Sequence, residues 1–147
     1  MENVMQQIAF THKKFMKLVK AECDKLQISK TTRAIIMTLA KNGALSQNEL
    51  GEKLMLTKPT ISLALKNMEQ LHLIKRLTSP EDKRVTIVTL TEDGIAMDNL
   101  IRAVFAKIEK EIKDALTEVE RKNLNEILQK IEKTIEMSER ELPNEEN

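Results

Sequence analysis

The stretch Thr57–Leu71, TKPTISLALKNMEQL, decides the fold of this 147-residue chain. Plotted at 100° per residue, it predicts a helix whose apolar and polar side chains lie on opposite faces. We expect the apolar face to pack on a core, and it consists of Ile61, Ala64, Leu65, Met68 and Leu71. The opposite face is short, polar and basic, and it consists of Pro59, Ser62, Leu63, Lys66, Asn67 and Gln70.

A shorter helix is expected directly before this one. The segment Ser46–Glu49 is a capping box, in which the serine hydroxyl accepts from the glutamate amide and the glutamate carboxylate reaches back. Leu50 and Leu54 are the buried pair that we expect on this helix. After a tight turn, Thr57 caps the second helix, with Pro59 in its first turn. Two short helices joined in this way predict a helix-turn-helix, whose second helix enters the major groove of DNA.

A β-hairpin is expected after the helix pair. Its strands are the β-branched runs Leu73–Leu77 and Val85–Leu90, and residues 78–84 form a polar tip that contains a proline. The tip carries Lys83 and Arg84. Because basic side chains on a projecting loop can enter a narrow minor groove, the hairpin is typical of the wing of a winged helix-turn-helix. The predicted fold class is therefore mostly α with a small β-hairpin wing.

Individual roles follow from residue type. Asp82 is expected to hold the wing by pairing with Arg84, since DNA phosphates would repel its carboxylate. Leu63 is expected to contact a thymine methyl, and Lys66 a base or a phosphate. The full set predicted to contact DNA is Lys58, Pro59, Thr60, Ser62, Leu63, Lys66, Asn67, Arg76, Lys83 and Arg84. The alternative is that this polar face is only solvated, and that the module docks a protein.

Charge is distributed unevenly along the chain, although the formal net charge is only +1. Residues 1–41 carry +5, residues 42–91 carry +2 and residues 92–147 carry −6. A nucleic acid would therefore meet the first two-thirds of the chain. With no Trp, no Tyr and 2% aromatic residues, stacking of bases on aromatic side chains is disfavoured, which argues against most single-strand and RNA-binding modes.

Long helices with apolar stripes are expected on both sides of the winged module. We predict one domain, 1–147, in which residues 30–91 form the DNA-binding lobe and 92–114 a connecting helix. Residues 1–28 and 115–142 are the predicted dimerisation helices, because exposed apolar stripes of this kind usually mark an interface. The alternative is a helical hairpin within one chain.

Five features follow one another along residues 30–115: the run Leu45–Leu54, the helix at Thr57, the strand ending in Arg76, the triplet Asp82-Lys83-Arg84 and the junction Leu90–Gly94. Together these features resemble the MarR family of bacterial regulators. Two positions depart from the family's pattern, because Leu63 lies where many members have Arg and His72 where a Gly usually ends the recognition helix.

This resemblance implies a homodimer with interleaved terminal helices, and most often a repressor. Two recognition helices about 34 Å apart would then bind a pseudo-palindromic operator. The resemblance also implies a small, aromatic or phenolic effector bound between the dimer helices and the DNA-binding lobe. His12, Met16 and Met37 are our candidates for its pocket, since methionine adapts to irregular cavities.

Cys23 raises a redox alternative, because one branch of the family senses peroxides with a single N-terminal cysteine. A sensing thiolate needs nearby cations or hydrogen-bond donors. Lys20 and Lys25 are close in sequence, but Glu22 and Asp24 flank the cysteine. The pattern therefore favours an inert thiol at the edge of the core.

Other chemistries are not indicated. His12 and Cys23 lie 11 residues apart on one helix, about 16 Å, and so cannot bind one metal ion within a chain. No nucleophile elbow, phosphate loop or His-Glu-x-x-His motif occurs, so we expect no catalysis and no cofactor. With one cysteine and no long apolar run, we expect a cytoplasmic protein without a membrane partner.

Overall fold

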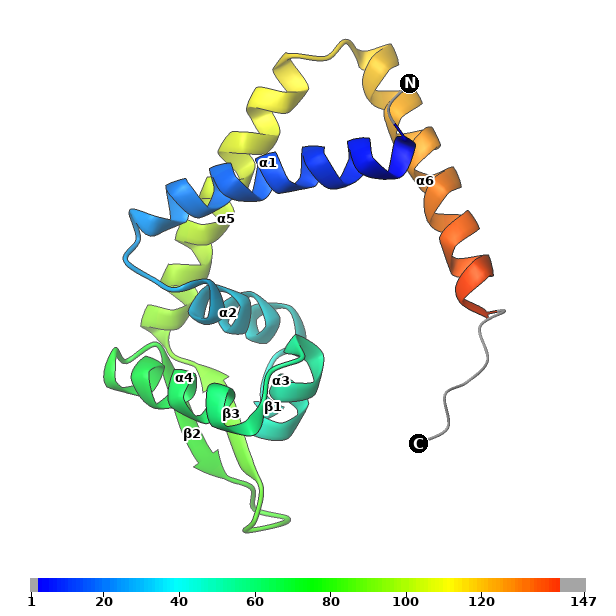
Figure 1. Ribbon diagram of the computed structural model, residues 1–147. Helices are drawn as coiled ribbons and strands as arrows, with labels where there is room; N and C mark the ends of the chain where they lie inside the picture. The colour runs from blue at the N-terminus through cyan, green and yellow to red at the C-terminus, as the bar shows by residue number, and fades with distance from the viewer. Residues whose placement is uncertain (1–2, 141–147) are drawn as a thin grey trace. The chain divides into compact units, whose positions relative to one another are not determined.

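The computed structural model describes residues 3–140 and confirms the predicted fold class, because that part of the chain is mostly helical with a small antiparallel sheet (Figure 1). Its elements are α1 (Val4–Asp24), α2 (Lys30–Asn42), β1 (Leu45–Ser46), α3 (Gln47–Leu54), α4 (Lys58–Gln70), β2 (Ile74–Thr78), β3 (Thr86–Leu90), α5 (Glu92–Asp114) and α6 (Glu118–Arg140).

The helix starts follow from their capping residues. Ser29 and Thr57 accept from the backbone amides three residues later, and so begin α2 and α4. Ser46 forms the predicted capping box with Glu49 at the start of α3. At α5, the Thr91 hydroxyl accepts from the Gly94 amide at 3.0 Å, so Thr91 caps this helix.

The sheet differs from the expected hairpin in two ways. Both hairpin strands begin one residue later than predicted, and a third strand, β1, pairs with β3 through Leu45 and Val88. The strand order is β1-β3-β2 and both pairs are antiparallel. Because β1 has only two residues, it carries no alternating pattern from which to predict it. It ties the start of α3 to the wing.

The core of the lobe lies between α2, α3, α4 and the sheet, and α5 adds Ile101 to it. The side chains of Ile35, Leu50 and Leu65 are completely buried. Burying one such side chain contributes about 1.5 to 3 kcal/mol. The rest of the buried cluster is Ile36, Leu39, Ile61, Met68, Leu73, Ile74, Val88 and Ile101.

Two predicted burial positions need correction. Leu71 was expected on the apolar face of α4 but is 59% exposed, because α4 ends at Gln70 and His72 takes a left-handed conformation with φ 58°. The chain reverses there, and Leu73 enters the core in place of Leu71. Leu54, expected to be buried with Leu50, is only half-buried.

The described chain divides into two compact units, one ending at Ala106 and the other beginning at Lys107. The first contains the winged lobe and α1, and the second the end of α5 and all of α6. Helix α6 has no buried residue in the described chain. The predicted single domain and its internal boundaries stay a prediction, and positions 141–142 of the predicted C-terminal helix lie outside the described residues.

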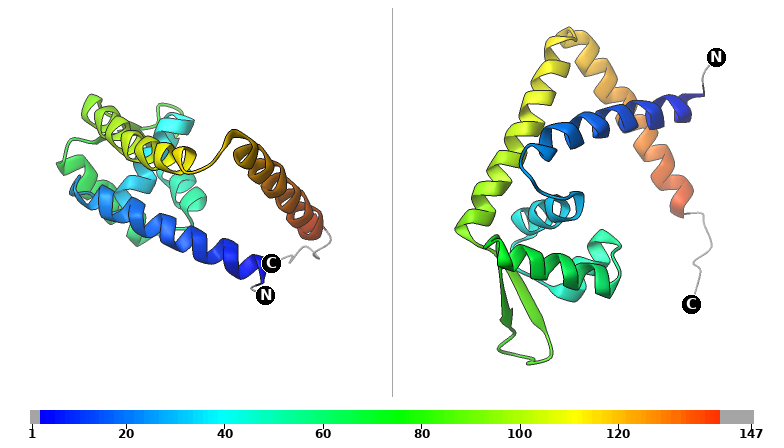
Figure 2. Two further views of the ribbon diagram at one scale, coloured as in Figure 1. Left: turned by 90° about the horizontal axis from the view of Figure 1, so that it is seen from above. Right: turned by 60° about the vertical axis from the view of Figure 1, so that its left-hand side comes forward.

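The wing projects from the lobe. In Figures 1 and 2 the β2–β3 hairpin extends beyond α4, and its tip lies away from the other elements of the lobe. Among the described residues, no helix is both long and apolar enough to span a membrane.

Candidate nucleic-acid interface

Helix α4 presents the predicted polar face to solvent. Its inner side chains Ile61, Leu65 and Met68 are at most 2% exposed. Leu63, on the outer face, is 62% exposed. The other six residues predicted to contact DNA from this helix are also exposed: Lys58, Pro59, Thr60, Ser62, Lys66 and Asn67. All seven therefore lie on one accessible surface, to which we refer below as the reading face.

The first turn of α4 is locally ordered. The hydroxyls of Thr57 and Thr60 lie 2.8 Å apart, and the Thr60 amide donates to Thr57. Pro59 occupies an early position where a missing amide costs nothing. The N-terminus of α4 consequently offers a fixed end with a partial positive charge, which suits a phosphate group.

Arg76, predicted to contact DNA, makes an ion pair within the lobe. Its Nε–H donates to the Glu69 carboxylate on α4, and its side chain is only 29% exposed. The contact joins strand β2 to the recognition helix.

The wing tip contains the predicted pair. Asp82 accepts both from the Arg84 amide at 3.0 Å and from the Arg84 Nε–H at 3.2 Å. The hairpin is closed by a hydrogen bond from the Ser79 amide to the Val85 carbonyl at 2.8 Å. The Arg84 side chain is nevertheless 91% exposed, and Lys83 is exposed beside it. Two cations therefore project from an ordered tip.

The start of α3 is stabilised by charge. The Ser46 amide donates to the Glu49 carboxylate at 2.7 Å, and the Ser46 hydroxyl accepts from the Glu49 amide at 3.1 Å. The pKa of Glu49 lies below the ordinary value of 4.5, mainly because its carboxylate accepts a hydrogen bond from the Ser46 backbone amide. The hydrogen bond with the Ser46 side chain lowers the pKa further. The carboxylate is ionised near neutral pH, where it also suits the positive end of the helix.

Sequence reasoning missed a residue in the turn between α3 and α4. Met55 takes a left-handed conformation with φ 53° and is 92% exposed. A positive φ at a non-glycine residue has no simple sequence signal, so the exposure was not predictable.

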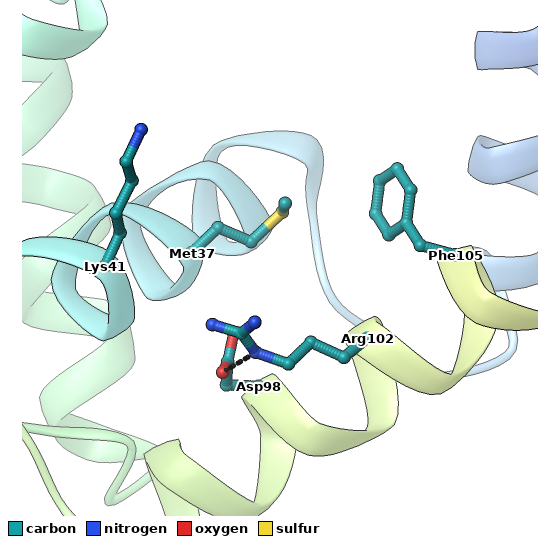
Figure 3. Close-up of a pocket in the computed structure, with 5 residues that line it drawn as sticks. All are labelled: Met37, Lys41, Asp98, Arg102 and Phe105. Carbon is teal, nitrogen blue, oxygen red and sulfur yellow. Dashed lines mark hydrogen bonds and ion pairs between the residues drawn. The ribbon is translucent and has the colours of Figure 1, made fainter. Parts of the chain in front are cut away.

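A hollow of about 490 Å³ lies in the first unit, between α2 and α5 (Figure 3). Of the three predicted pocket residues, only Met37 lines it. His12 is exposed on α1 and Met16 is half-buried, and neither belongs to the lining formed by the described residues. That lining is Met37, Lys41, Asp98, Arg102 and Phe105.

Asp98 and Arg102 were not predicted as site residues. Asp98 is 6% exposed and accepts from the Arg102 Nε–H at 2.6 Å. A sequence signal did exist, because Asp98 falls at helical spacing from Ile101, Phe105 and Ile108 on the apolar face of α5. An acidic residue in such a stripe indicates a buried carboxylate.

Cys23 is 1% exposed on α1. The neighbouring Lys20 and Lys25 form ion pairs with Asp24 and Glu22. Within residues 3–140, no group of three or more His, Cys, Asp or Glu side chains has a geometry that suits a metal ion.

This chain is similar in sequence to known bacterial regulators. A model of the MarR family matches residues 28–86. The regulator MhqR of Bacillus subtilis is 30% identical over 104 residues, which cover 71% of this chain and 72% of MhqR. The organic hydroperoxide resistance transcriptional regulator of the same species is 38% identical over 78 residues, and the match spans about half of each protein, 53%.

Solved structures show the same fold. MepR, a transcription regulator of the Staphylococcus aureus multidrug efflux pump MepA, has a TM-score of 0.83 at 20% identity, and the match covers 91% of this chain and 99% of MepR. The MepR–DNA complex has a TM-score of 0.71 at 21% identity, with 92% and 99% covered. At this identity the likeness establishes the fold.

The helix pair and the wing, together with the family match and the similarity to known regulators, define a DNA-binding transcriptional regulator of the winged helix-turn-helix class. The relatives are transcriptional regulators and not enzymes. The chain belongs to the MarR family.

Proposed function

We propose that this chain is a sequence-specific repressor that binds a pseudo-palindromic operator as a homodimer and is released from it by a small effector. The observation that carries the proposal is the reading face of α4, whose predicted contact residues are all exposed beside an ordered basic wing tip. Docking of a protein requires neither the basic wing nor the basic helix face.

The reading face supplies different kinds of contact. Ser62 and Asn67 carry short polar groups suited to base edges, and Lys66 carries a charge suited to a base or a phosphate. Leu63 offers an exposed apolar surface to a thymine methyl. Lys58, Pro59 and Thr60 lie in the first turn, where the chain would enter the groove.

The wing supplies the second contact. Lys83 and Arg84 enter the minor groove in our proposal, and Asp82 fixes the tip from which they project. Arg76 acts as a positioning residue, since Glu69 already accepts from its Nε–H. The ion pair sets the distance between the wing and the reading face.

The dimer rests on helices whose apolar side chains have no cover in the described chain. Val4, Met5 and Phe10 on α1 are more than half exposed. On α6, Val119, Ile127 and Ile135 are exposed to a similar degree. Exposed stripes of this length usually mark an interface. Light scattering at micromolar concentration tests the proposal, and a monomer mass would contradict it.

The decisive experiment is selection of bound sequences from random duplex DNA at about 0.15 M salt. We expect an inverted repeat whose half-sites lie one helical turn apart. Lys66→Ala should then lower the slope of binding against salt by about one if Lys66 contacts a phosphate. Lys130→Ala on α6 is the matched control, and its slope should not change. Recovery of no sequence above background would favour a protein-docking module.

A redox-controlled regulator is the second candidate. It is supported by the 38% identity to a regulator named for organic hydroperoxide resistance and by the single cysteine of this chain. Burial of Cys23 and the carboxylates paired with Lys20 and Lys25 oppose it. Release of DNA by mild peroxide that Cys23→Ser abolishes would establish it.

The proposed location is the cytoplasm, where a regulator of this family meets chromosomal DNA. Whether the regulator represses or activates is tested by transcription from the selected operator with and without the protein. We expect transcription to fall when the protein is added.

A further inference from the structure

Basic side chains gather on α1, outside the winged lobe. No Asp or Glu occurs between residues 3 and 21, and the four lysines of this segment are Lys13, Lys14, Lys17 and Lys20. All four are exposed, and we refer to them below as the lysine face. The segment therefore carries a charge of +4, whereas residues 42–91, which contain the reading face and the wing, carry only +2.

The lysine face lies on the side of α1 that does not pack on the protein. Lys17 follows Lys13 by four residues, so the two side chains lie one above the other on the helix. Val19, two residues after Lys17, points to the opposite side and is completely buried. The packing of α1 on the first unit thus leaves the lysines open to solvent.

Little of this charge is neutralised within the chain. Lys13 and Lys17 have no ion pair in the part of the chain that the structure describes. Lys20 pairs with Asp24 at 2.6 Å, but it is 68% exposed, and such pairs contribute little to stability. Lys14 lies over the ring of a phenylalanine one turn earlier on α1, a contact that leaves its charge in place. The lysine face is therefore available to an anionic partner.

The lysines of α6 have a different setting. Lys130 and Lys133 are exposed as well, but residues 118–140 contain six acidic and five basic side chains. Mixed charges of this kind are typical of a solvated helix surface. An unbroken set of cations, as on α1, instead indicates a surface that meets a polyanion.

The lysine face and the reading face belong to different sides of the first unit. Ile61 and Leu65 on the inner side of α4 share a core with Ile35 and Ile36 of α2, so the reading face points away from α2. Helix α1 lies beyond α2, on the side opposite to α4 (Figures 1 and 2). A duplex bound to the reading face therefore leaves the lysine face uncovered.

The composition of the lysine face favours phosphate over other anionic partners. Protein interfaces are depleted in lysine, whereas Lys and Arg make many of the contacts to DNA phosphates. A helix that binds a membrane surface inserts its apolar side chains into the bilayer. On α1, Val19 and Cys23 are buried on the other side of the helix and cannot do so.

The spacing of the lysines also suits a DNA strand. Lys13 and Lys20 are seven residues apart, which is about 10.5 Å along the helix axis. Successive phosphates of one strand are about 3.4 Å apart along the duplex. The lysine face therefore spans about three phosphate steps of one strand.

We propose that the lysine face binds the phosphate backbone of a second DNA duplex while the reading face holds the operator, so that one protein bridges two DNA segments. Phosphate contacts carry no sequence information, so the second duplex is any DNA. The inference goes beyond the proposed function, because operator recognition needs only the reading face and the wing. Bridging rests on the proposed function, whereas the contact of α1 with DNA does not.

The contact is tested without an operator. A labelled duplex of random sequence is titrated with the full chain, and anisotropy is measured between about 0.05 and 0.2 M salt. The starting variant carries Lys66→Gln, Lys83→Gln and Arg84→Gln, which weaken binding through the reading face and the wing. We expect the further double change Lys13→Gln/Lys17→Gln to lower the slope of log affinity against log salt by about two, since each phosphate contact contributes about 0.9.

Lys130→Gln/Lys133→Gln on α6 is the matched control, because it removes the same charge from another exposed helix surface. Its slope should not change. Circular dichroism and light scattering check that both double variants keep their helix content and mass. Equal slopes for the two double variants would overturn the proposal, and so would a starting variant that does not bind the duplex.

Two other polyanions test the class of partner. Polyglutamate represents an acidic protein, and vesicles that contain phosphatidylserine represent an anionic membrane. We expect both to bind the starting variant more weakly than the duplex does. Tighter binding of either one that Lys13→Gln/Lys17→Gln abolishes would overturn the assignment to DNA.

Bridging is tested with the selected operator fixed to a surface. The unaltered chain is loaded onto the operator, and the labelled duplex of random sequence is then passed over it. We expect the loaded chain to retain this duplex, and Lys13→Gln/Lys17→Gln to abolish retention without changing the loading. Retention that survives the double change would overturn the proposal. Failure to select any operator would contradict the proposed function alone, because the salt slopes do not depend on it.

Discussion

Helices α4 and α6 are both amphipathic, but they differ in what covers their apolar side chains. Helix α4 has 13 residues and buries Ile61, Leu65 and Met68. Helix α6 has 23 residues, and none of its own side chains is buried in the described chain. Helical periodicity therefore predicts an apolar face without predicting its partner. The partner of α4 is within the chain, whereas we propose that the partner of α6 is a second copy.

Removing one leucine from each helix should have the greatest consequence. Leu65→Ala should lower the free energy of unfolding by about 2 to 5 kcal/mol, because it leaves a cavity in a filled core. Leu128→Ala on α6 removes a side chain that is 40% exposed. Its cost should depend on protein concentration, since it weakens association rather than the folded chain. Urea unfolding at two protein concentrations measures both effects.

The difference between the two helices would not exist if Leu65→Ala and Leu128→Ala changed the free energy of unfolding in the same way. Equal losses that do not change with concentration would place a partner for α6 within the chain. A monomeric mass for the unaltered protein together with a large loss from Leu128→Ala would have the same meaning.

The second prediction concerns how the next helix, α5, begins. A Cβ atom on Gly94 would lie 2.1 Å from the Leu73 carbonyl oxygen, a backbone atom. Gly94→Ala should therefore push α5 away from the end of α4, at a cost of about 1 to 3 kcal/mol. Gly51→Ala is the control, because its Cβ would make an ordinary contact of 3.4 Å with the Leu56 carbonyl oxygen. The alanine there should be neutral or slightly stabilising.

Thermal unfolding of the two glycine variants distinguishes the cases. A Gly94→Ala protein as stable as the Gly51→Ala protein would mean that the α4–α5 junction is not tightly packed.

The elements of the winged lobe were largely predictable because local signals agreed there. Caps at Ser46 and Thr57, the apolar spacing of α4 and the turn residues of the wing all indicate the same fold. The Asp82–Arg84 contact was also predictable, since both residues lie in one short turn. These features depend on neighbours in the sequence.

What the sequence concealed depends on contacts across the fold. The Glu69–Arg76 ion pair joins a helix to a strand, and the pairing of Leu45 with Val88 spans most of the lobe. The hollow likewise forms between α2 and α5, so Asp98 was missed as one of its lining residues. Such contacts have no local periodicity from which to predict them.

The third prediction compares the two capping boxes. Ser46 caps α3 inside the lobe, and Thr117 caps α6, with hydrogen bonds to Glu120 of 2.8 and 2.9 Å. Ser46→Ala should lower the stability of the lobe by about 1 kcal/mol. Thr117→Ala should fray only the start of α6, because that helix packs on no core in the described chain. Hydrogen exchange of the amides in each first turn measures the difference.

Acid provides a further test of these caps. Hydrogen bonds from Ser46 and Thr117 lower the pKa of Glu49 and of Glu120 below 4.5. Because each folded pKa lies below its unfolded value, the stabilisation is present above pH 4.5 and is lost as the pH falls through the folded pKa. Glu49→Gln should therefore flatten the acid side of the unfolding curve of the lobe. An unchanged acid side would mean that Glu49 does not stabilise α3.

The most modest change is expected at His72, which departs from the glycine common in the family. His72 has φ 58°, a backbone conformation that destabilises the folded state by about 1 kcal/mol or more at a residue other than glycine. Glycine relieves this strain, but it also makes the unfolded chain more flexible, which lowers stability by a somewhat smaller amount. His72→Gly should therefore stabilise the lobe by about 0.5 kcal/mol. Gln27→Gly is the matched control, since Gln27 has φ 57° between α1 and α2.

DNA binding gives this substitution its second use. The His72 carbonyl, which accepts from Thr91, survives replacement by glycine, so the α4–α5 junction stays closed. His72→Gly should then leave affinity for the selected operator unchanged, because the reading face ends before residue 72. A loss of affinity without a loss of stability would instead place the imidazole at the DNA. The interface would then extend beyond α4 into the segment that joins the recognition helix to the wing.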